Sequence, residues 1–164
     1  MHPCVWSEAV LLAACREESS RGSRPGGQHA NVSASGVRLV YLADPAIRAK
    51  ADEERDRRVN RRRALRRMRM RLALAIRGGS DPAVLDAHRA RSGFRISVKS
   101  DDFPAVICVL LDALEEAEGE LVSAARACKL GTSPYVRTLA LDKQAWQAAQ
   151  VIRRRHGHAA LRHS

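Results

Sequence analysis

The chain is poor in aromatic residues and has no long apolar run. Only 4% of its 164 residues are Phe, Trp or Tyr, so stacking on single-stranded bases is not expected to be its main mode of binding. A transmembrane helix needs about 20 consecutive apolar residues, and the chain has no such run. Its first residues also lack the basic start and extended apolar stretch of a secretory signal peptide. We therefore expect a cytoplasmic protein without a membrane partner.

Cysteine is also sparse, and its spacing argues against a metal site. The four cysteines are Cys4, Cys15, Cys108 and Cys128, and no Cys-x-x-Cys pair occurs among them. Zinc binding is therefore not expected, and we predict reduced, mostly buried thiols. The sequence implies neither a metal nor an organic cofactor.

Positive charge, in contrast, is abundant. The formal net charge is +11 and the pI is about 10.7, which favours a polyanionic partner because neutralising phosphates releases condensed counterions. Ten arginines lie between residues 55 and 71, and guanidinium groups suit bidentate phosphate contacts. That segment lacks the large aromatic residues of a membrane-surface helix. Any single arginine there is best interpreted as solvated, but the cluster favours RNA.

The most distinctive motif is Gly26-Gly27-Gln28, within a polar loop from about Ser20 to Ser35. Glycine adopts positive φ without steric cost, so the pair can bring Gln28 close to a partner. Glutamine has no useful pKa for acid–base catalysis. Its N–H and side-chain amide can instead stabilise an oxyanion and hold a water molecule. An isolated Gly-Gly pair is more often a simple turn, so its context decides the interpretation.

That context resembles the catalytic domain of class I peptide-chain release factors and of the related codon-independent ribosome-rescue hydrolases. Their pattern is Arg-x-Ser-Gly-x-Gly-Gly-Gln-(His/Asn)-x-Asn, followed after small polar residues by Ser-Ala-Val-Arg and an apolar strand. Their next helix begins Glu-Arg-Ser-Gln-x-x-Asn-(Lys/Arg), and residues 54–61 match it except for Asp56-Arg57 in place of Ser-Gln. Arg24 stands where the family has glycine. The matching loop residues are Arg21, Ser23, Gly26, Gly27, Gln28, His29, Asn31, Ser35, Val37 and Arg38.

The resemblance implies a ribosome-dependent hydrolase that cleaves the ester joining a peptide to the 3′ end of tRNA. Gly26 and Gly27 are then expected to shape a loop that enters the peptidyl-transferase centre of the large subunit. The N–H of Gln28 is expected to stabilise the oxyanion, and its side chain to position water or exclude competitors. The residues expected to steer or brace the loop are Arg21, Arg24 and Arg38. The residues expected to contact ribosomal RNA are Arg55, Arg58, Arg61, Arg62 and Arg66.

Release factors that read stop codons carry a further codon-reading loop or tripeptide, for which this sequence offers no candidate. We therefore expect a codon-independent hydrolase that acts on peptidyl-tRNA in stalled ribosomes. Two alternatives remain: a hydrolysis-inactive ribosome-binding factor and a nucleic-acid-binding helix-turn-helix regulator. The sequence indicates no oligomeric state.

The helix-turn-helix alternative comes from residues 127–136, where an alanine precedes the turn residue Gly131 by four positions. Ser133-Pro134 is predicted to cap the second helix. That helix has only Arg137 as a basic residue, whereas a groove-reading helix usually offers more donors. A packing role is therefore favoured. The basic end of the chain, from Arg153 onward, is either a probe of the messenger channel, as in rescue hydrolases, or a frayed helix end.

Periodicity and turn residues predict an α+β fold with a small β-sheet, a long packed helix and a helical subdomain after them. The resemblance implies that the sheet and the long helix form a GGQ domain. The predicted division is 1–79 for the catalytic domain, 80–93 for a linker and 94–164 for the mainly helical part. Leu65, Met68, Leu72 and Ile76 form the apolar stripe of the long helix. The predicted elements are a helix or strand over 8–16, strands over 37–41, 47–51 and 94–99, and helices over about 52–77, 104–118, 120–129, 134–141 and from 142 onward.

Overall fold

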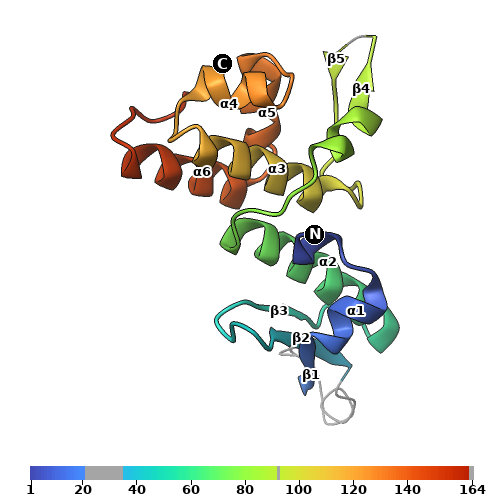
Figure 1. Ribbon diagram of the computed structural model, residues 1–164. Coiled ribbons are helices and arrows are strands. Elements are labelled where there is room, and N and C mark those ends of the chain that lie inside the picture. The colour runs from blue at the N-terminus through green and yellow to red at the C-terminus, as the bar shows by residue number, and fades with distance from the viewer. Residues whose placement is uncertain (21–34, 92, 163–164) are drawn as a thin grey trace. The chain divides into compact units, whose positions relative to one another are not determined.

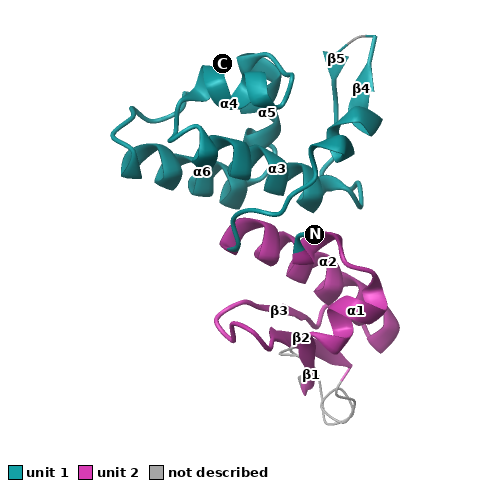
Figure 2. Ribbon diagram, viewed as in Figure 1, with its two compact units in different colours: residues 1–2, 76–164 teal, residues 3–75 magenta. Residues whose placement is uncertain are grey.

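A computed structural model describes residues 1–20, 35–91 and 93–162 (Figure 1). The chain has an α+β fold, as predicted, and divides into two compact units (Figure 2). One unit consists of residues 3–75, and the other consists of residues 1–2 together with 76–164. The predicted functional domains, 1–79 and 94–164, stay a prediction. Each unit is described separately below.

The unit of residues 3–75 is a three-stranded antiparallel sheet with a long helix packed against it (Figure 1). The strands lie in the order β1-β2-β3, and Ser20 at the end of β1 is the register partner of Gly36 at the start of β2. The segment predicted as a helix or a strand contains both, because a short helix precedes β1. The elements are η1 (Pro3–Val5), α1 (Glu8–Ala13), β1 (Cys15–Ser20), β2 (Gly36–Tyr41), β3 (Arg48–Ala51) and α2 (Arg57–Ala75).

The core of this unit lies between β2 and α2. Val37 and Leu39 of β2 are fully buried and Arg38 between them is exposed, but Val40 and Tyr41 are buried too, so β2 is covered on both faces along most of its length. From α2, the predicted residues Leu65, Met68 and Leu72 are buried. The predicted fourth member of this stripe, Ile76, lies beyond the helix end at Ala75 and is only half-buried.

The start of α2 differs from the prediction, because the helix begins at Arg57 rather than near Asp52. Asp56 accounts for this start. Its carboxylate accepts the N–H of Arg58 at 2.7 Å and its carbonyl accepts the N–H of Asn60 at 3.1 Å, as an N-cap residue does. The acidic residues before it therefore do not form the first helical turn.

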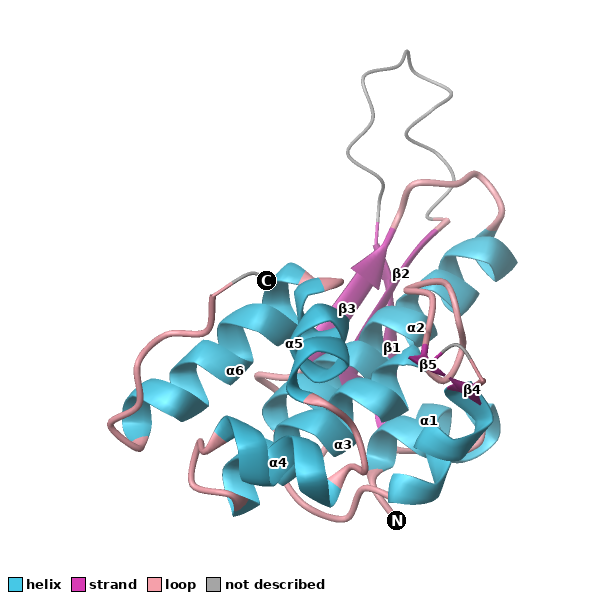
Figure 3. Ribbon diagram, turned by 90° about the horizontal axis from the view of Figure 1, so that it is seen from above, coloured by secondary structure: helices cyan, strands magenta, loops and turns pink. Residues whose placement is uncertain are grey.

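The second unit is mainly helical and is centred on α3. All residues from Phe103 to Leu114 are buried, and α3 contacts α4, α5 and α6 (Figure 3). This segment reads as a nearly continuous apolar run because neighbouring helices surround it. The elements are η2 (Pro82–His88), β4 (Arg89–Ala90), β5 (Gly93–Phe94), α3 (Phe103–Glu116), α4 (Leu121–Ala127), α5 (Thr132–Ala140) and α6 (Lys143–Arg155).

Two details of this unit correct the sequence predictions. The strand predicted over 94–99 is limited to Gly93–Phe94, because the Ser100 N–H donates to the Ser97 carbonyl at 2.9 Å and closes a turn. The third helix begins at Thr132 with Gly131 as its N-cap, so Ser133 lies inside the first turn rather than capping it.

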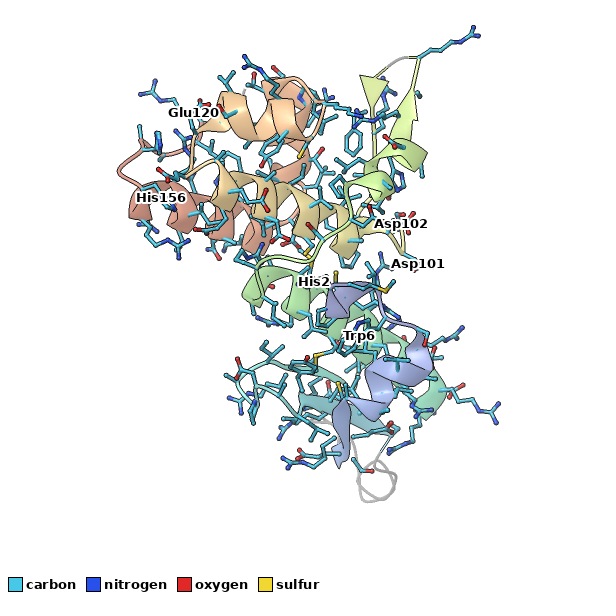
Figure 4. The ribbon with its side chains drawn as sticks, viewed as in Figure 1. His2, Trp6, Asp101, Asp102, Glu120 and His156 are labelled. Atoms are coloured by element: carbon cyan, nitrogen blue, oxygen red, sulfur yellow. The ribbon has the colours of Figure 1, made fainter. Side chains whose placement is uncertain are left out.

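Carboxylates cap two of the α-helices in the described part of this unit. Asp142 caps α6, as predicted, by accepting the N–H groups of Gln144 and Ala145, each at 2.9 Å. Glu120 caps α4 (Figure 4). A side-chain hydrogen bond with Ser123, together with backbone N–H bonds, lowers the pKa of Glu120 from 4.5 to about 2.

Candidate functional site

The predicted catalytic residues belong to the segment that joins β1 to β2. Gly26, Gly27 and Gln28 lie outside the described residues, as do Arg21 and Arg24. The positions that flank the segment are described, since Ser20 and Gly36 face each other in the antiparallel hairpin. The structure therefore defines where this segment leaves the sheet and where the chain returns to it.

The return point is held by Asn60, from the first turn of α2. Its Nδ2 donates to the Ser35 carbonyl and to the Glu54 carbonyl, both at 2.8 Å, and its Oδ1 accepts the Glu54 N–H at 3.0 Å. Ser35 Oγ also donates to the Glu54 carbonyl at 3.0 Å. Asn60 has 0% exposure, and such a buried amide is tolerated only when it is hydrogen-bonded.

The departure point is held by two arginines from the same turn of α2. Arg57 donates to Ser19 Oγ at 2.8 Å and to Glu17 Oε1 at 2.7 Å. Arg61 donates through Nε to Glu17 Oε2 at 2.9 Å. Both carboxylate oxygens of Glu17 therefore receive a charge-assisted hydrogen bond. The last residues of β1 are thereby tied to α2.

Other arginines of α2 pair with the acidic residues that precede the helix. Arg63 lies 2.8 Å from Glu54 Oε1, and Arg67 lies 2.7 Å from Glu53 Oε1. The hydrogen bond from Arg67 lowers the pKa of Glu53. These ion pairs place two positive charges next to two negative charges, so they add little to the attraction of a polyanion.

Some of the arginines predicted to bind RNA form no such ion pair with the described residues. Arg58 and Arg62 are exposed and lie one turn apart on α2. Among the described residues, neither of them nor the exposed Arg55 has a carboxylate within salt-bridge distance. Arg66, a further turn along, is also exposed. Arg61 and Arg38, in contrast, are paired with Glu17 and Glu18 respectively.

The helix-turn-helix pattern corresponds to α4, a turn and α5. The turn closes with Lys129 at φ 52° and with a 2.9 Å hydrogen bond from the Leu130 N–H to the Ala125 carbonyl, a helix C-terminal motif. Tyr135 of α5 is fully buried and donates its hydroxyl to the Leu110 carbonyl of α3. Arg137 is exposed. These contacts favour a packing role for α5.

The basic end of the chain packs back onto α6. The side-chain amide of Gln150 exchanges two hydrogen bonds with the backbone of Leu161, at 3.0 and 2.8 Å, and Leu161 is 7% exposed. Arg155 and His156 both contact the carboxylate of Glu115. Burial raises the pKa of Glu115, but these two partners outweigh it and the pKa is lowered. Through Arg162, the described tail is neither a frayed helix end nor extended away from α6.

All four cysteines are free and buried, as predicted. Burial raises the pKa of Cys15, and it raises the pKa of Cys128 to about 11. These two groups are therefore thiols at neutral pH and poor nucleophiles.

Sequence reasoning missed the residues that hold the two ends of the β1–β2 connection. Asn60 lies within the helix pattern quoted above, but the pattern assigns no partner to its side chain. Arg57 was part of an arginine cluster in which every member looked equivalent. The spacing of Arg57, Asn60 and Arg61, which puts them on one face of the first turn, was the available signal.

Comparison with known proteins identifies the first part of the chain. The family model of the RF-1 domain, the GGQ-containing domain of class I release factors, matches residues 9–97. This range is more than half of the chain, and it includes the sheet, α2 and the segment between β1 and β2. No curated protein and no solved structure matches the chain significantly. No helix in the described ranges is both long enough and apolar enough to cross a membrane.

Proposed function

The chain belongs to the RF-1 domain family, and we propose that it hydrolyses the peptidyl-tRNA ester on stalled ribosomes without reading a codon. The observation that carries the proposal is the family match over residues 9–97, because that range contains Gly26-Gly27-Gln28 between two strands whose ends are fixed. Ribosome, peptidyl-tRNA and ribosomal RNA are the partners that this activity requires.

The chemistry assigned to this segment is electrostatic rather than acid–base. A water oxygen attacks the ester carbonyl carbon, and the bond from that carbon to the ribose 3′ oxygen breaks. The peptide leaves as a carboxylic acid, and the tRNA regains its 3′ hydroxyl. The backbone N–H of Gln28 stabilises the oxyanion formed on the way, while Gly26 and Gly27 allow its close approach. Since glutamine does not titrate, substrate and ribosome must move the proton.

Contact with ribosomal RNA is assigned to four exposed arginines in or just before α2, namely Arg55, Arg58, Arg62 and Arg66. Arg58 and Arg62 support this assignment because the described residues leave their charge without a carboxylate partner. Arg55 and Arg66 extend the same basic surface at its two ends. Phosphates bound there release counterions, so the affinity should fall steeply as salt rises.

Codon independence is assigned because residues 98–162 form packed helices and turns whose sequence offers no codon-reading tripeptide. α3 is buried and α5 uses Tyr135 to pack on it. A codon reader, in contrast, must expose its recognition loop to the messenger.

A peptide-release assay on ribosomes with an empty decoding site tests the proposal. We expect the native chain to release peptide at the same rate with and without a stop codon in that site. We expect Gln28→Ala and Gly27→Ala to bind the ribosome normally and to lose release, by about 100-fold or more if oxyanion contact is disturbed.

The same assay separates the alternatives. A native chain that binds ribosomes but releases nothing is the hydrolysis-inactive factor. Tight binding to duplex DNA without ribosomes, abolished by Arg137→Ala, identifies the helix-turn-helix regulator. Release that occurs only with a stop codon would contradict codon independence but would leave the proposed hydrolase activity intact.

A further inference from the structure

The first turn of α2 contacts both ends of the β1–β2 connection. Arg57, Asn60 and Arg61 are spaced by three and four residues, so their side chains share one face of the helix. Two of them hold the end of β1 and the third holds the residue before β2. We call these three residues the α2 clamp.

At the return end, the α2 clamp leaves the backbone of Ser35 little freedom to move. The amide of Asn60 makes three hydrogen bonds, to the Ser35 carbonyl and to both backbone groups of Glu54. The Asn60 side chain itself has 0% exposure, while Ser35 and Glu54 are half-buried. The carbonyl of Ser35 is therefore fixed relative to the helix axis by a rigid amide.

At the departure end, the contact is ionic and more exposed. Glu17 lies in β1 and accepts Arg57 on one oxygen and Arg61 on the other. Arg57 also donates a hydrogen bond to Ser19 Oγ, and Ser19 is the second-to-last residue of β1. One guanidinium therefore connects two positions of β1 to α2 and orients the strand end.

We propose that the α2 clamp positions the Gly26–Gln28 segment for peptide release, so that Arg57 and Asn60 are positioning residues of the reaction. This inference rests on the hydrolase activity proposed above. A loop that delivers an oxyanion donor works only near its productive geometry, and a displacement of about 1 Å can cost about 100-fold in rate. The α2 clamp holds Ser19 and Ser35, the described positions on either side of this segment.

Arg57→Gln tests the proposal, with Arg67→Gln as its matched control. Both arginines are surface residues of α2 that pair with a glutamate at 2.7 Å, and both changes remove one positive charge. Arg67, however, bonds to Glu53 and to the Lys50 carbonyl, away from β1. The rate at saturating protein and the concentration for half-maximal release are measured separately.

We expect Arg57→Gln to lower the saturated rate by about 10-fold or more, with a half-maximal concentration equal to that of the control. Arg67→Gln should keep the native saturated rate. Arg57→Lys retains the charge but has a compact ammonium in place of the planar fork, so it should recover only part of the rate. An unchanged saturated rate in Arg57→Gln, or an equal loss in Arg67→Gln, overturns the proposal.

Hydrogen exchange at the Glu54 amide tests the clamp without using the reaction. Asn60→Ala removes the acceptor of this amide, so its exchange should accelerate, while Arg67→Gln should leave it unchanged. If the native chain releases no peptide, the proposed function fails, but the exchange experiment still reports on the clamp. If Asn60→Ala does not fold, the Arg57 pair decides the outcome. Native exchange in folded Asn60→Ala contradicts the clamp.

Discussion

The two units of the chain use their acidic residues differently. Residues 3–75 contain 16 of the 29 Lys and Arg residues but only 8 of the 18 acidic ones, so this unit carries most of the net positive charge. Its glutamates pair with a subset of arginines, such as Arg57 and Arg63. Among the described residues, Arg58 and Arg62 have no carboxylate within salt-bridge distance.

In the helical unit, carboxylates mainly stabilise the fold. Glu120 and Asp142 cap helices, and Glu115 receives two side chains from the end of α6. The central helix of this unit is also more buried than the long helix of the first unit. Of the 14 residues of α3, 12 are buried, compared with 6 of the 19 residues of α2. The long helix of the first unit is therefore less buried than the central helix of the second, which agrees with the proposal that the first unit contacts a partner.

The core of the helical unit provides the largest expected effect on stability. Leu110 of α3 has 0% exposure, so Leu110→Ala should lower the free energy of unfolding by about 2–5 kcal/mol through lost burial and a cavity. Val122 of α4 is 51% exposed, and Val122→Ala should change the free energy by less than about 0.5 kcal/mol. Urea unfolding followed by helical circular dichroism measures both. Equal losses would mean that α3 is not the core.

Two pairs of arginines on α2 sharpen the charge comparison. Arg58 and Arg62 lie one turn apart without a carboxylate partner among the described residues, whereas Arg63 and Arg67, also one turn apart, pair with glutamates. Changing either pair to glutamine removes two charges. We expect the change at Arg58 and Arg62 to weaken ribosome binding by about 10-fold, which corresponds to about 1.4 kcal/mol of binding free energy. The slope of log affinity against log salt concentration should become shallower by about 1.5.

The second change, at Arg63 and Arg67, should alter ribosome affinity by less than the first. Binding measured across a salt series distinguishes the two. If both variants weaken binding equally, net charge alone governs the interaction, and the distinction between paired and unpaired arginines loses its functional meaning.

The cap of α6 gives a smaller expected change. Asp142→Ala removes the acceptor of two N–H groups and should cost about 1 kcal/mol. Asp142→Asn keeps a side-chain oxygen there and should cost only a few tenths. Thermal unfolding of the three proteins measures the difference, and an asparagine variant as unstable as the alanine variant would show that charge, not capping, matters.

Local patterns in the sequence predicted those features that local geometry decides. The stripe of Leu65, Met68 and Leu72 identified the buried face of α2, since helical periodicity alone sets which residues share a face. The cap by Asp142 was equally visible, because a cap and its N–H donors are neighbours in sequence.

Features that depend on distant partners were not predictable. Asn60 acts on a carbonyl 25 residues away, and Arg57 on a carboxylate 40 residues away. The alternation over residues 94–99 is typical of a strand, yet a strand needs a partner. Pairing with Arg89–Ala90 extends only through Gly93–Phe94, before the turn at Ser97–Ser100. Nothing local to the alternating residues indicates that limit.

The cap of α4 gives the smallest expected effect near neutral pH and a characteristic pH dependence. The pKa of Glu120 is lowered from 4.5 to about 2 by its bonds to Ser123 and to the Val122 N–H. A folded-state pKa below the unfolded one means that the folded protein favours the ionised cap. The stability difference between the native chain and Glu120→Gln should therefore be complete above about pH 4.5, decline between pH 4.5 and 2, and vanish below about 2. Urea midpoints of both proteins across this range measure it. A difference that stays constant down to pH 2 would show that the ionised carboxylate is not what caps α4, and would remove one carboxylate from the stabilising role that distinguishes the helical unit.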